Sequence, residues 1–512
     1  MTTVGRALPP LSPTREEFRR LAAGGNLVPV YAEVAADLDT PLSAFLRLRP
    51  GPYACLLESV EGGEKWARYS FLGSEPSMVF TAKGKRLTVR HADGRVESLK
   101  AESPFAALRE LLARFTPVAV PGLPRFQGGA VGYISYDMVR HVEELPRLAK
   151  DDLKLPDAVF MFTDSLLVFD NLRHRLLVIG NAHITERDTA GLDRAYDEAV
   201  KRIEAMLDKL ARPARPPAPL TFPAVEPLVA MGEEGFTSTM DEATFMERVR
   251  QAKEYIAAGD AYQIVVSRRV DTELSADPFT VYRALRSINP SPYLFFLRLG
   301  KTSIVGSSPE VLVRMEEGRV EERPIAGTHP RGKNEADDER LAAEMQSDPK
   351  ERAEHVMLVD LGRNDVGRVS QIGSVEVTEF MVVERYSHVM HLVSHVRGRL
   401  EEGRDAFHVL EACVPAGTLT GAPQIRAMQI IEELEPTRRG PYGGAVGYIS
   451  YSGNLDSCIT IRTIVCRDGV AHVQAGAGIV ADSVPATEYE ETQNKAAALF
   501  RAIEVAAAQS DW

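Results

Sequence analysis

Hydrophobic positions in the second half of the chain follow first a helical and then a strand spacing. Four apolar residues recur every three or four positions, which predicts an amphipathic helix: Phe245, Val249, Ala252 and Ile256. Gly259 lies where such a helix would end. The run 262–267 follows directly and predicts a strand, on which Gln263, Val265 and Ser267 share one face.

Other elements carry similar signals. Pro349 suits the first turn of a predicted helix, and another helix is predicted to begin at Thr487, with Glu490 placed for a capping box. Two β-branched runs predict strands, at 375–383 and 459–465. Helices and strands do not alternate regularly, so the pattern favours the α+β class over a parallel barrel.

A proline-rich segment divides the chain. Residues 211–227 read ARPARPPAPLTFPAVEP, and proline at this density favours an extended, semi-rigid backbone. We therefore predict an N-terminal region at 15–210, a linker at 211–239 and a C-terminal region at 240–508.

The nonapeptide GGAVGYISY occurs twice, at 128–136 and at 443–451. Its alternating apolar residues suit a strand, and its glycines permit a close approach of two backbones. One interpretation places the two copies at equivalent edges of two related sheets. The other is a chance similarity between two strands.

Composition narrows the class of protein. The formal net charge of −12 argues against a nucleic-acid-binding protein, which usually has a basic surface. No apolar run approaches the length of a membrane span, and the N-terminus lacks the apolar core of a signal peptide, so we expect a cytoplasmic protein without membrane contact. The four cysteines include no C-x-x-C pair, which fits a reducing compartment.

Two predicted helices each carry the motif Glu-x-x-Glu. Glu351 and Glu354 share a helix face, as do Glu488 and Glu491, and Lys495 lies one turn further along the second helix. Paired carboxylates suit a hard divalent cation such as magnesium. A solvated helix surface is the competing interpretation, and the spacing alone leaves both open.

Two glycine-containing segments are candidates for ligand contact. The segment QAGAGIV at 474–480 contains G-x-G, but turn residues rather than a helix follow it, which excludes a dinucleotide-binding motif. Gly476 and Gly478 instead expose backbone N–H groups to a ligand or allow close strand packing. Similarly, Gly327 and Thr328 lie in a loop that offers donors to a carboxylate or forms a structural turn.

Taken together, these segments resemble the chorismate-utilising enzymes, and within them component I of the anthranilate synthases. The resemblance covers about residues 25–505 and is strongest after residue 240. The sequence stretches that carry it are GSSPEVLVR (306–314), PIAGTHPRG (324–332), KERAEHVMLVDLGRND (350–365), PAGTLTGAPQIRAM (415–428), YGGAVGYIS (442–450) and EETQNKA (490–496).

The resemblance implies a fold of two antiparallel β-sheets packed as a sandwich, with helices outside. It implies Mg²⁺ bound by Glu354 and Glu491, with Glu351 and Glu488 nearby. The residues that it assigns to chorismate binding are Gly327, Thr328, Tyr442, Arg462, Gly476, Ala477, Gly478 and Lys495. Chorismate is a dianion and the chain is acidic, so local cations rather than long-range attraction must hold it.

The implied reaction converts chorismate and ammonia to anthranilate and pyruvate, the first step of tryptophan biosynthesis. Glu310 resembles the general acid that protonates the departing 4-hydroxyl, and His391 and Thr418 match residues near the reacting ring. To donate a proton near neutral pH, Glu310 needs a raised pKa.

Two positions distinguish this reaction from its relatives. Aminodeoxychorismate synthase component I typically carries lysine where Ala326 stands, and the isochorismate and salicylate synthases carry lysine where Gln263 stands. Both of these enzyme types remain alternatives within the family. A non-catalytic amino-acid sensor is the alternative from another class, although the intact glutamates argue against it.

The resemblance also implies partners and an inhibitor. None of the cysteines stands in a glutaminase motif, so glutamine use requires a separate amidotransferase subunit, component II, in a heterotetramer with two copies of each component. The N-terminal LLES motif (56–59) resembles a tryptophan-sensing motif. L-tryptophan is therefore expected to inhibit the enzyme at a pocket formed by Glu58, Ser59, Asn289, Pro292, Tyr293 and Leu294.

Overall fold

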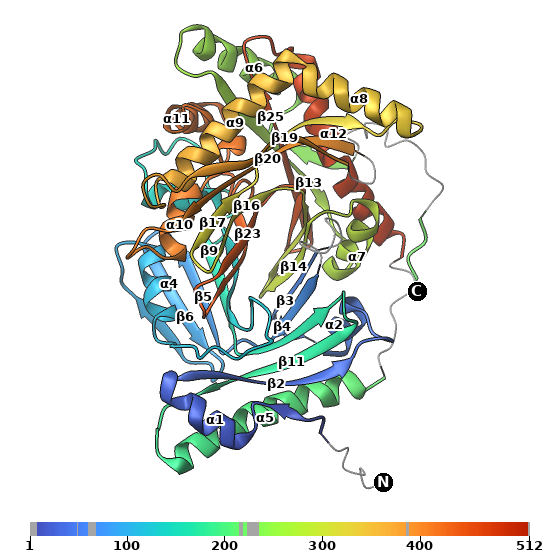
Figure 1. The fold of residues 1–512 in the computed structure, drawn as a ribbon. Helices are drawn as coiled ribbons and strands as arrows, with labels where there is room; N and C mark the ends of the chain where they lie inside the picture. The colour runs from blue at the N-terminus through green and yellow to red at the C-terminus, as the bar shows by residue number, and fades with distance from the viewer. Residues whose placement is uncertain are drawn as a thin grey trace.

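A computed structural model describes residues 8–48, 50–59, 68–213, 219–222, 235–385 and 389–509, without the side chains at 328, 330, 350 and 389. Within these residues the strands form two large sheets, and every pairing between named strands is antiparallel. The predicted α+β fold of two antiparallel sheets with outer helices is confirmed (Figure 1).

The first sheet joins strands from both halves of the chain. Its spatial order is β1 (Leu11–Ser12), β2 (Leu27–Ala35), β11 (Arg175–His183), β10 (Ser165–Asp170), β4 (Tyr69–Ser74), β3 (Tyr53–Glu58), β14 (Tyr293–Leu299), β15 (Thr302–Ser308), β24 (Thr463–Arg467), β25 (Val470–Ile479), β13 (Gln263–Glu273) and β12 (Phe236–Ser238). The short β21 (Gly421–Ala422) also pairs with β13.

The second sheet is also built from both halves. Its order is β18 (Ile325–Pro330), β20 (Val389–Arg399), β17 (Arg319–Glu322), β16 (Val311–Glu316), β23 (Leu455–Ile459), β22 (Ala445–Ser450), β8 (Gly129–Ile134), β9 (Ala158–Thr163), β5 (Met78–Lys83), β6 (Arg86–His91) and β7 (Val96–Leu99), with β19 (Glu376–Arg385) paired to β20.

Two hydrophobic clusters on either side of the first sheet account for its packing. Side chains from both sheets, among them Phe71, Val131, Phe295 and Tyr448, meet in the core between the sheets. The outer face of the first sheet packs under α1 (Arg15–Leu21), α2 (Pro41–Leu48), α5 (Thr189–Ala211), α7 (Pro278–Ile288) and α12 (Pro485–Ala507). In Figure 1, α1 and α5 cover β2 and β11 at the bottom of the view.

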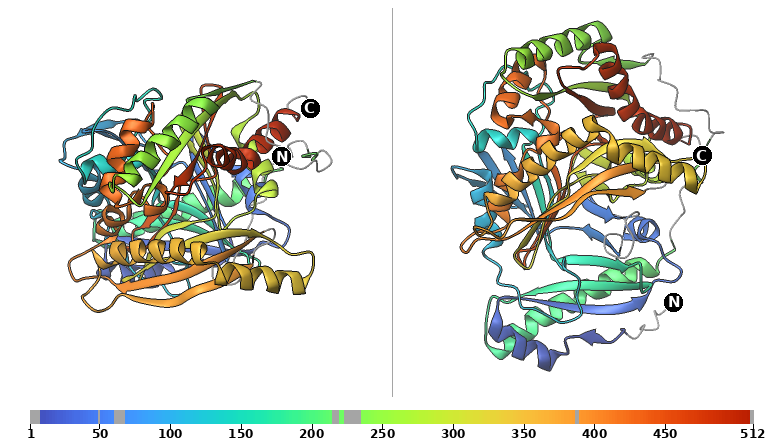
Figure 2. Two further views of the ribbon diagram at one scale, coloured as in Figure 1. Left: turned by 90° about the horizontal axis from the view of Figure 1, so that it is seen from above. Right: turned by 45° about the horizontal axis from the view of Figure 1, so that its top comes forward.

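The remaining helices cover the second sheet and the C-terminal end of the first. They are α4 (Pro104–Leu112), α6 (Glu242–Ala257), α8 (Glu335–Ser347), α9 (Pro349–Gly367), α10 (Ala406–Cys413) and α11 (Gln424–Leu434). α9 packs against β18 and β20, which places its length along the face of these strands (Figure 2).

Several predicted elements are confirmed, and two need correction. α6, β13, the start of α9 at Pro349 and β19 agree with the sequence patterns. α12 begins at Pro485 rather than Thr487, and no side chain caps its N-terminus. The run 459–465 is not one strand, because β23 ends at Ile459 and β24 begins at Thr463. Arg462, in the turn between them, has a positive φ of 50°.

The repeated nonapeptide pairs with itself. β8 and β22 are neighbours at the centre of the second sheet, with Gly132 opposite Gly447. The prediction of equivalent edges in two sheets is therefore wrong. A Cβ at Gly132 would lie 1.8 Å from the Val159 carbonyl oxygen, and one at Gly447 would lie 2.1 Å from that of Asp456. Both glycines thus permit close contact with the flanking strands.

Candidate active site

Lys495 on α12 and Arg462 form a pair of neighbouring cations. The ammonium group of Lys495 lies 2.5 Å from Glu491 and donates a hydrogen bond of 2.9 Å to the carbonyl oxygen of Gly476 on β25. Arg462 donates to the backbone carbonyl of Lys495 at 2.9 Å, so both cations are anchored to the same turn of α12. Burial lowers the pKa of Arg462, although a guanidinium remains protonated at neutral pH.

The glycines of β25 allow two side chains to approach the strand. A Cβ at Gly478 would lie 2.8 Å from Nε2 of Gln263, and one at Gly476 would lie 3.0 Å from the hydroxyl of Tyr442. Ala477 between them is fully buried. Burial raises the pKa of Tyr442 to about 12, so its hydroxyl stays protonated. Close packing of the Gln263 and Tyr442 side chains thus explains the glycine spacing.

His391 and Gly327 form a second group of candidate site residues. Nδ1 of His391 on β20 lies 2.8 Å from the carbonyl oxygen of Gly327 on β18, which requires the ring proton on Nδ1. Burial lowers the pKa of His391, which favours the neutral ring. Gly327 has a φ of 61°, and a Cβ there would lie 2.7 Å from a carboxylate oxygen of Glu351. Ala326 is buried beside it, whereas the side chain of Thr328 lies outside the described structure.

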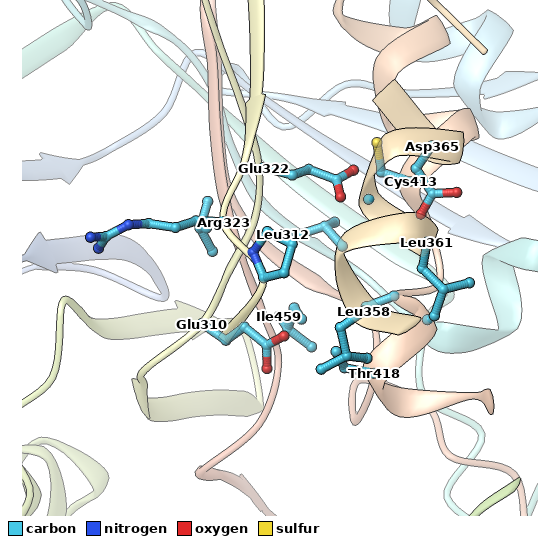
Figure 3. A pocket seen from close by; sticks show the side chains of 15 residues that line it. Glu310, Leu312, Glu322, Arg323, Leu358, Leu361, Asp365, Cys413, Thr418 and Ile459 are labelled. Atoms are coloured by element: carbon cyan, nitrogen blue, oxygen red, sulfur yellow. The ribbon is translucent and has the colours of Figure 1, made fainter. Parts of the chain in front are cut away.

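Glu310 lies in the turn between β15 and β16 and lines a pocket of about 390 Å³ together with Thr418 (Figure 3). Its backbone carbonyl accepts a hydrogen bond of 3.0 Å from the N–H of Ile459. Burial raises the pKa of Glu310 to about 7, while Thr418 and Lys495 oppose this shift. The direction of this shift agrees with the expectation for Glu310.

The four candidate metal ligands lie on two helices. Glu351 and Glu354 lie in the first two turns of α9, and Glu488 and Glu491 lie in the first two turns of α12. Among the described residues, no three acidic, histidine or cysteine side chains are clustered closely enough to form a complete metal site. Magnesium needs only one or two protein carboxylates, because water and substrate oxygens complete its shell. Burial and the neighbouring Glu491 raise the pKa of Glu488, as in a like-charge pair that a cation would stabilise.

These side chains influence one another across the elements. The charge of Lys495 acts on Glu310, and the charge of Arg462 acts on His391. Glu491 and Tyr442 in turn oppose the lowering of the Arg462 pKa by burial. The structure therefore brings the predicted acid, histidine, cations and α12 carboxylate into one electrostatic environment.

The pocket beside Glu310 also contains residues that the sequence analysis missed. Glu322, Asp365 and Cys413 line it together with Arg323. Asp365 lies on the same face of α9 as Glu354, eleven residues away, so a helical projection could have found it. Glu322 and Cys413 carry no local signal in the sequence.

A second pocket, of about 540 Å³, lies between the sheets. Its lining includes most residues of the expected tryptophan site: Glu58, Ser59, Pro292, Tyr293 and Leu294. The Ser59 hydroxyl is buried and has no hydrogen-bond partner within the described part of the chain, whereas Glu58 accepts hydrogen bonds from Tyr282 at 2.5 Å and Arg286 at 3.1 Å. Asn289 lies outside this lining, and its side chain donates to Ser307 at 3.4 Å.

The sequence and the fold both match known proteins. Residues 51–501 match the family described as chorismate binding enzyme. The fold resembles the anthranilate synthase component I of Streptococcus pneumoniae, with a TM-score of 0.71, 37% identity and coverage of 91% of this chain and 98% of that one. The menaquinone-specific isochorismate synthase of Escherichia coli shares the fold, with a TM-score of 0.67, 18% identity and coverage of 95% and 98%. The chain therefore belongs to the chorismate binding enzymes.

Curated relatives place the chain more closely. Anthranilate synthase component 1 of Pseudomonas aeruginosa is 50% identical over 498 residues, which cover 96% of this chain and 99% of the relative. The same component of Acetivibrio thermocellus is 49% identical over 494 residues, with the same coverage. Within the family, the chain groups with component 1 of the anthranilate synthases. None of the helices described here is long and apolar enough to span a membrane.

Proposed function

We propose that the chain catalyses the formation of anthranilate and pyruvate from chorismate and ammonia, as the first step of tryptophan biosynthesis in the cytoplasm. The observation that carries this proposal is the position of Glu310, a carboxyl with a pKa of about 7 within reach of the charge of Lys495. Such a group can hold a proton for a departing hydroxyl while nearby cations hold a dianionic substrate.

The proposed division of roles follows from the geometry. Arg462 and Lys495 bind carboxylates of chorismate, and Tyr442 and the β25 glycines shape the floor beneath the ring. Glu310 protonates the 4-hydroxyl as its C–O bond breaks, with Thr418 beside it. His391 is held with its proton on Nδ1 by Gly327, so its other nitrogen carries the lone pair.

We further propose a requirement for magnesium. Glu354 and Glu491 would hold the ion, with Glu351 and Glu488 nearby, and a bound magnesium ion would neutralise a substrate carboxylate. The raised pKa of Glu488 supports this assignment, because paired carboxylates without a cation repel each other.

The nitrogen source is proposed to be free ammonia for this chain alone and glutamine in the presence of an amidotransferase subunit. The printed designation "component 1" of the relatives supports a second component. The four cysteines are buried and free, which fits a structural role and a reducing compartment.

Feedback inhibition by L-tryptophan is proposed at the 540 Å³ pocket. This pocket contacts β3, β14, β22 and β23, and therefore both sheets. A ligand that binds one arrangement of the sheets better than another shifts the population toward that arrangement. Tyr293 in its wall is hydrogen-bonded to Asp456 at 2.9 Å, which links the two sheets directly.

Product identification tests the proposal. Purified protein is incubated with chorismate, magnesium and an ammonium salt, and the products are separated by chromatography. Anthranilate and pyruvate in equal amounts are the expected result. A dominant yield of 4-amino-4-deoxychorismate or isochorismate would assign the chain to one of the alternative reactions, and no product at all would favour a non-catalytic sensor.

A further inference from the structure

The pocket that holds the carboxyl of Glu310 continues to a second group of acidic side chains. Glu322 enters it from the end of β17, Asp365 from α9 and Cys413 from the end of α10 (Figure 3). The proposed reaction as described above assigns no role to these three groups. The pocket volume of about 390 Å³ is sufficient to admit water between them.

Glu322 is the most unusual of these residues. It is only 9% exposed, and its Oε1 atom is buried without a hydrogen-bond partner among the residues that the structure describes. The other oxygen, Oε2, lies 2.9 Å from where a Cβ would stand at Gly362, on the pocket face of α9. A buried carboxyl oxygen without a partner is costly, and the neutral form reduces that cost.

Asp365 lies one helical turn beyond Leu361 on α9 and is 8% exposed. Burial and the charges of Asp365 and Glu310 raise the pKa of Glu322 well above its usual value, and burial raises the pKa of Asp365 to about 7. Two interacting buried carboxyls titrate as a pair, so they retain at least one proton near neutral pH. The structure thus places a store of protons in the pocket of the general acid.

Every turnover leaves Glu310 without its proton, because the proton departs with the 4-hydroxyl as water. On the basis of the proposed function, we propose that Glu322, with Asp365 behind it, returns a proton to Glu310 after each turnover. The proton moves from the Glu322 carboxyl through water in the pocket to the Glu310 carboxylate. Asp365 then passes a proton to Glu322, and solvent restores the pair. No bond other than O–H is made or broken in these steps.

Charged and titratable groups on every side of the pocket fit this path. The charges of Glu310, Asp365, Arg368 and Lys495 act on the relay carboxyls, and the Cys413 thiol hydrogen-bonds to Glu322. The pocket-lining Arg323 is paired with Glu384. The carboxylates of Glu310 and Glu322 repel each other when both are ionised, so the pair retains a proton that either carboxyl can hold.

The test separates the first turnover from later ones. Glu322→Gln retains the shape of the side chain but cannot donate its proton, whereas Glu310 can still begin with a proton bound. We expect a first turnover at the wild-type rate, followed by a steady-state rate reduced by about tenfold or more, with the KM for chorismate unchanged within about twofold. Stopped-flow fluorescence of anthranilate measures both phases.

Glu321→Gln is the matched control, because Glu321 is the adjacent residue on the same strand and lies outside the pocket lining. It should leave both phases unchanged. If Glu322→Gln does not fold, Asp365→Asn is tested with the same two-phase expectation. An equal loss in both phases, or an unchanged steady state, would overturn the relay. Absence of anthranilate from the wild-type protein would instead overturn the proposed function.

Discussion

The Glu491 carboxylate lies 2.5 Å from the ammonium group of Lys495, one turn further along α12. The pair is partly exposed, so it contributes little to stability on its own. Under the proposed function, we expect Lys495 to hold the carboxylate in place until a metal ion and substrate bind. We predict that Glu491→Gln lowers kcat/KM by about two orders of magnitude or more, because a bound magnesium ion contributes several kcal/mol.

Glu490→Gln is the matched control for this experiment, since Glu490 lies next in sequence and is exposed. Calorimetric titration with magnesium should show weaker binding for Glu491→Gln and unchanged binding for Glu490→Gln. Both variants should unfold at temperatures close to that of the wild type. Full activity of the wild-type protein after exhaustive chelation would contradict the magnesium assignment.

The pKa of Glu310 predicts a pH dependence. Its raised pKa of about 7 means that the acid is protonated below this pH and ionised above it. A general acid acts in its protonated form, so kcat/KM for chorismate should fall as the pH rises through the pKa of Glu310 in the free enzyme. Glu310→Gln should reduce kcat by about 10²–10⁴-fold and abolish this alkaline limb.

Two controls apply to the pH profile. The magnesium concentration must be saturating at each pH, because under the proposed metal site protonation of the nearby Glu488 would weaken metal binding as the pH falls. Activity after return to neutral pH shows that unfolding does not cause the loss. An alkaline limb that persists in Glu310→Gln would assign the titration to another group.

The pocket between the sheets predicts a feedback-resistant variant. Ser59 lines it with a buried hydroxyl that has no partner, so Ser59→Phe should fill space that L-tryptophan would occupy. We expect the inhibition constant for L-tryptophan to rise by more than about tenfold while kcat without inhibitor stays within about twofold. Inhibition curves at fixed chorismate concentration measure this.

Ser98→Phe makes the same substitution at an exposed position on β7 and should leave the inhibition unchanged. A wild-type protein that ignores millimolar L-tryptophan would contradict the proposed feedback site. If the Ser59→Phe variant is as sensitive to L-tryptophan as the wild type, L-tryptophan binds at a different site.

The choice of nucleophile is predicted to depend on Gln263. Its amide lies against β25, 2.8 Å from the position of a Cβ at Gly478. An amide cannot remove a proton from water at neutral pH, whereas ammonia needs no such base. We therefore expect almost no turnover without ammonia, and Gly478→Ala should displace Gln263 and lower kcat.

Gln263→Lys tests the same position in the opposite direction. A lysine here could add slow water chemistry, detected as isochorismate by chromatography, only if its neighbours also lower its pKa. Because the residues around position 263 surround a glutamine and are not arranged to lower the pKa of a lysine, we expect at most a trace of isochorismate. Isochorismate as the main product of the wild-type protein would contradict the role given to Gln263.

Local patterns predicted the elements that have strong local causes. The helix before Gly259 and the start of α9 at Pro349 are encoded by apolar spacing and by the fixed φ of proline. The interruption at Arg462 could not be predicted, because β-branched residues on both sides continue the strand pattern. It depends on tertiary contacts: Arg462 reaches the carbonyl of Lys495 on α12.

The site was predictable to the extent that the family motifs carry it. The spacing of Glu-x-x-Glu singled out candidate carboxylates on α9 and α12, but it left a solvated surface equally open and could not show how far apart the two helices lie. Glu322 and Asp365 come together only because α9 packs against β17 of the second sheet. Such a contact between distant segments leaves no periodic signal in either of them.

The close approach of β22, which carries the second nonapeptide, to its neighbour β23 leads to the last prediction. At Gly447 on β22, an added Cβ would lie 2.1 Å from the carbonyl oxygen of Asp456, and backbone in the middle of a sheet cannot move aside. Gly447→Ala should therefore destabilise the protein by about 1–3 kcal/mol or more. Gly51→Ala is the control, because no atom lies within 4 Å of the added Cβ. It should be neutral or slightly stabilising, since alanine restricts the unfolded chain. Thermal and urea unfolding of the three proteins measure the difference. Equal stability of Gly447→Ala and the wild type would show that β22 and β23 are not packed as closely as this distance indicates.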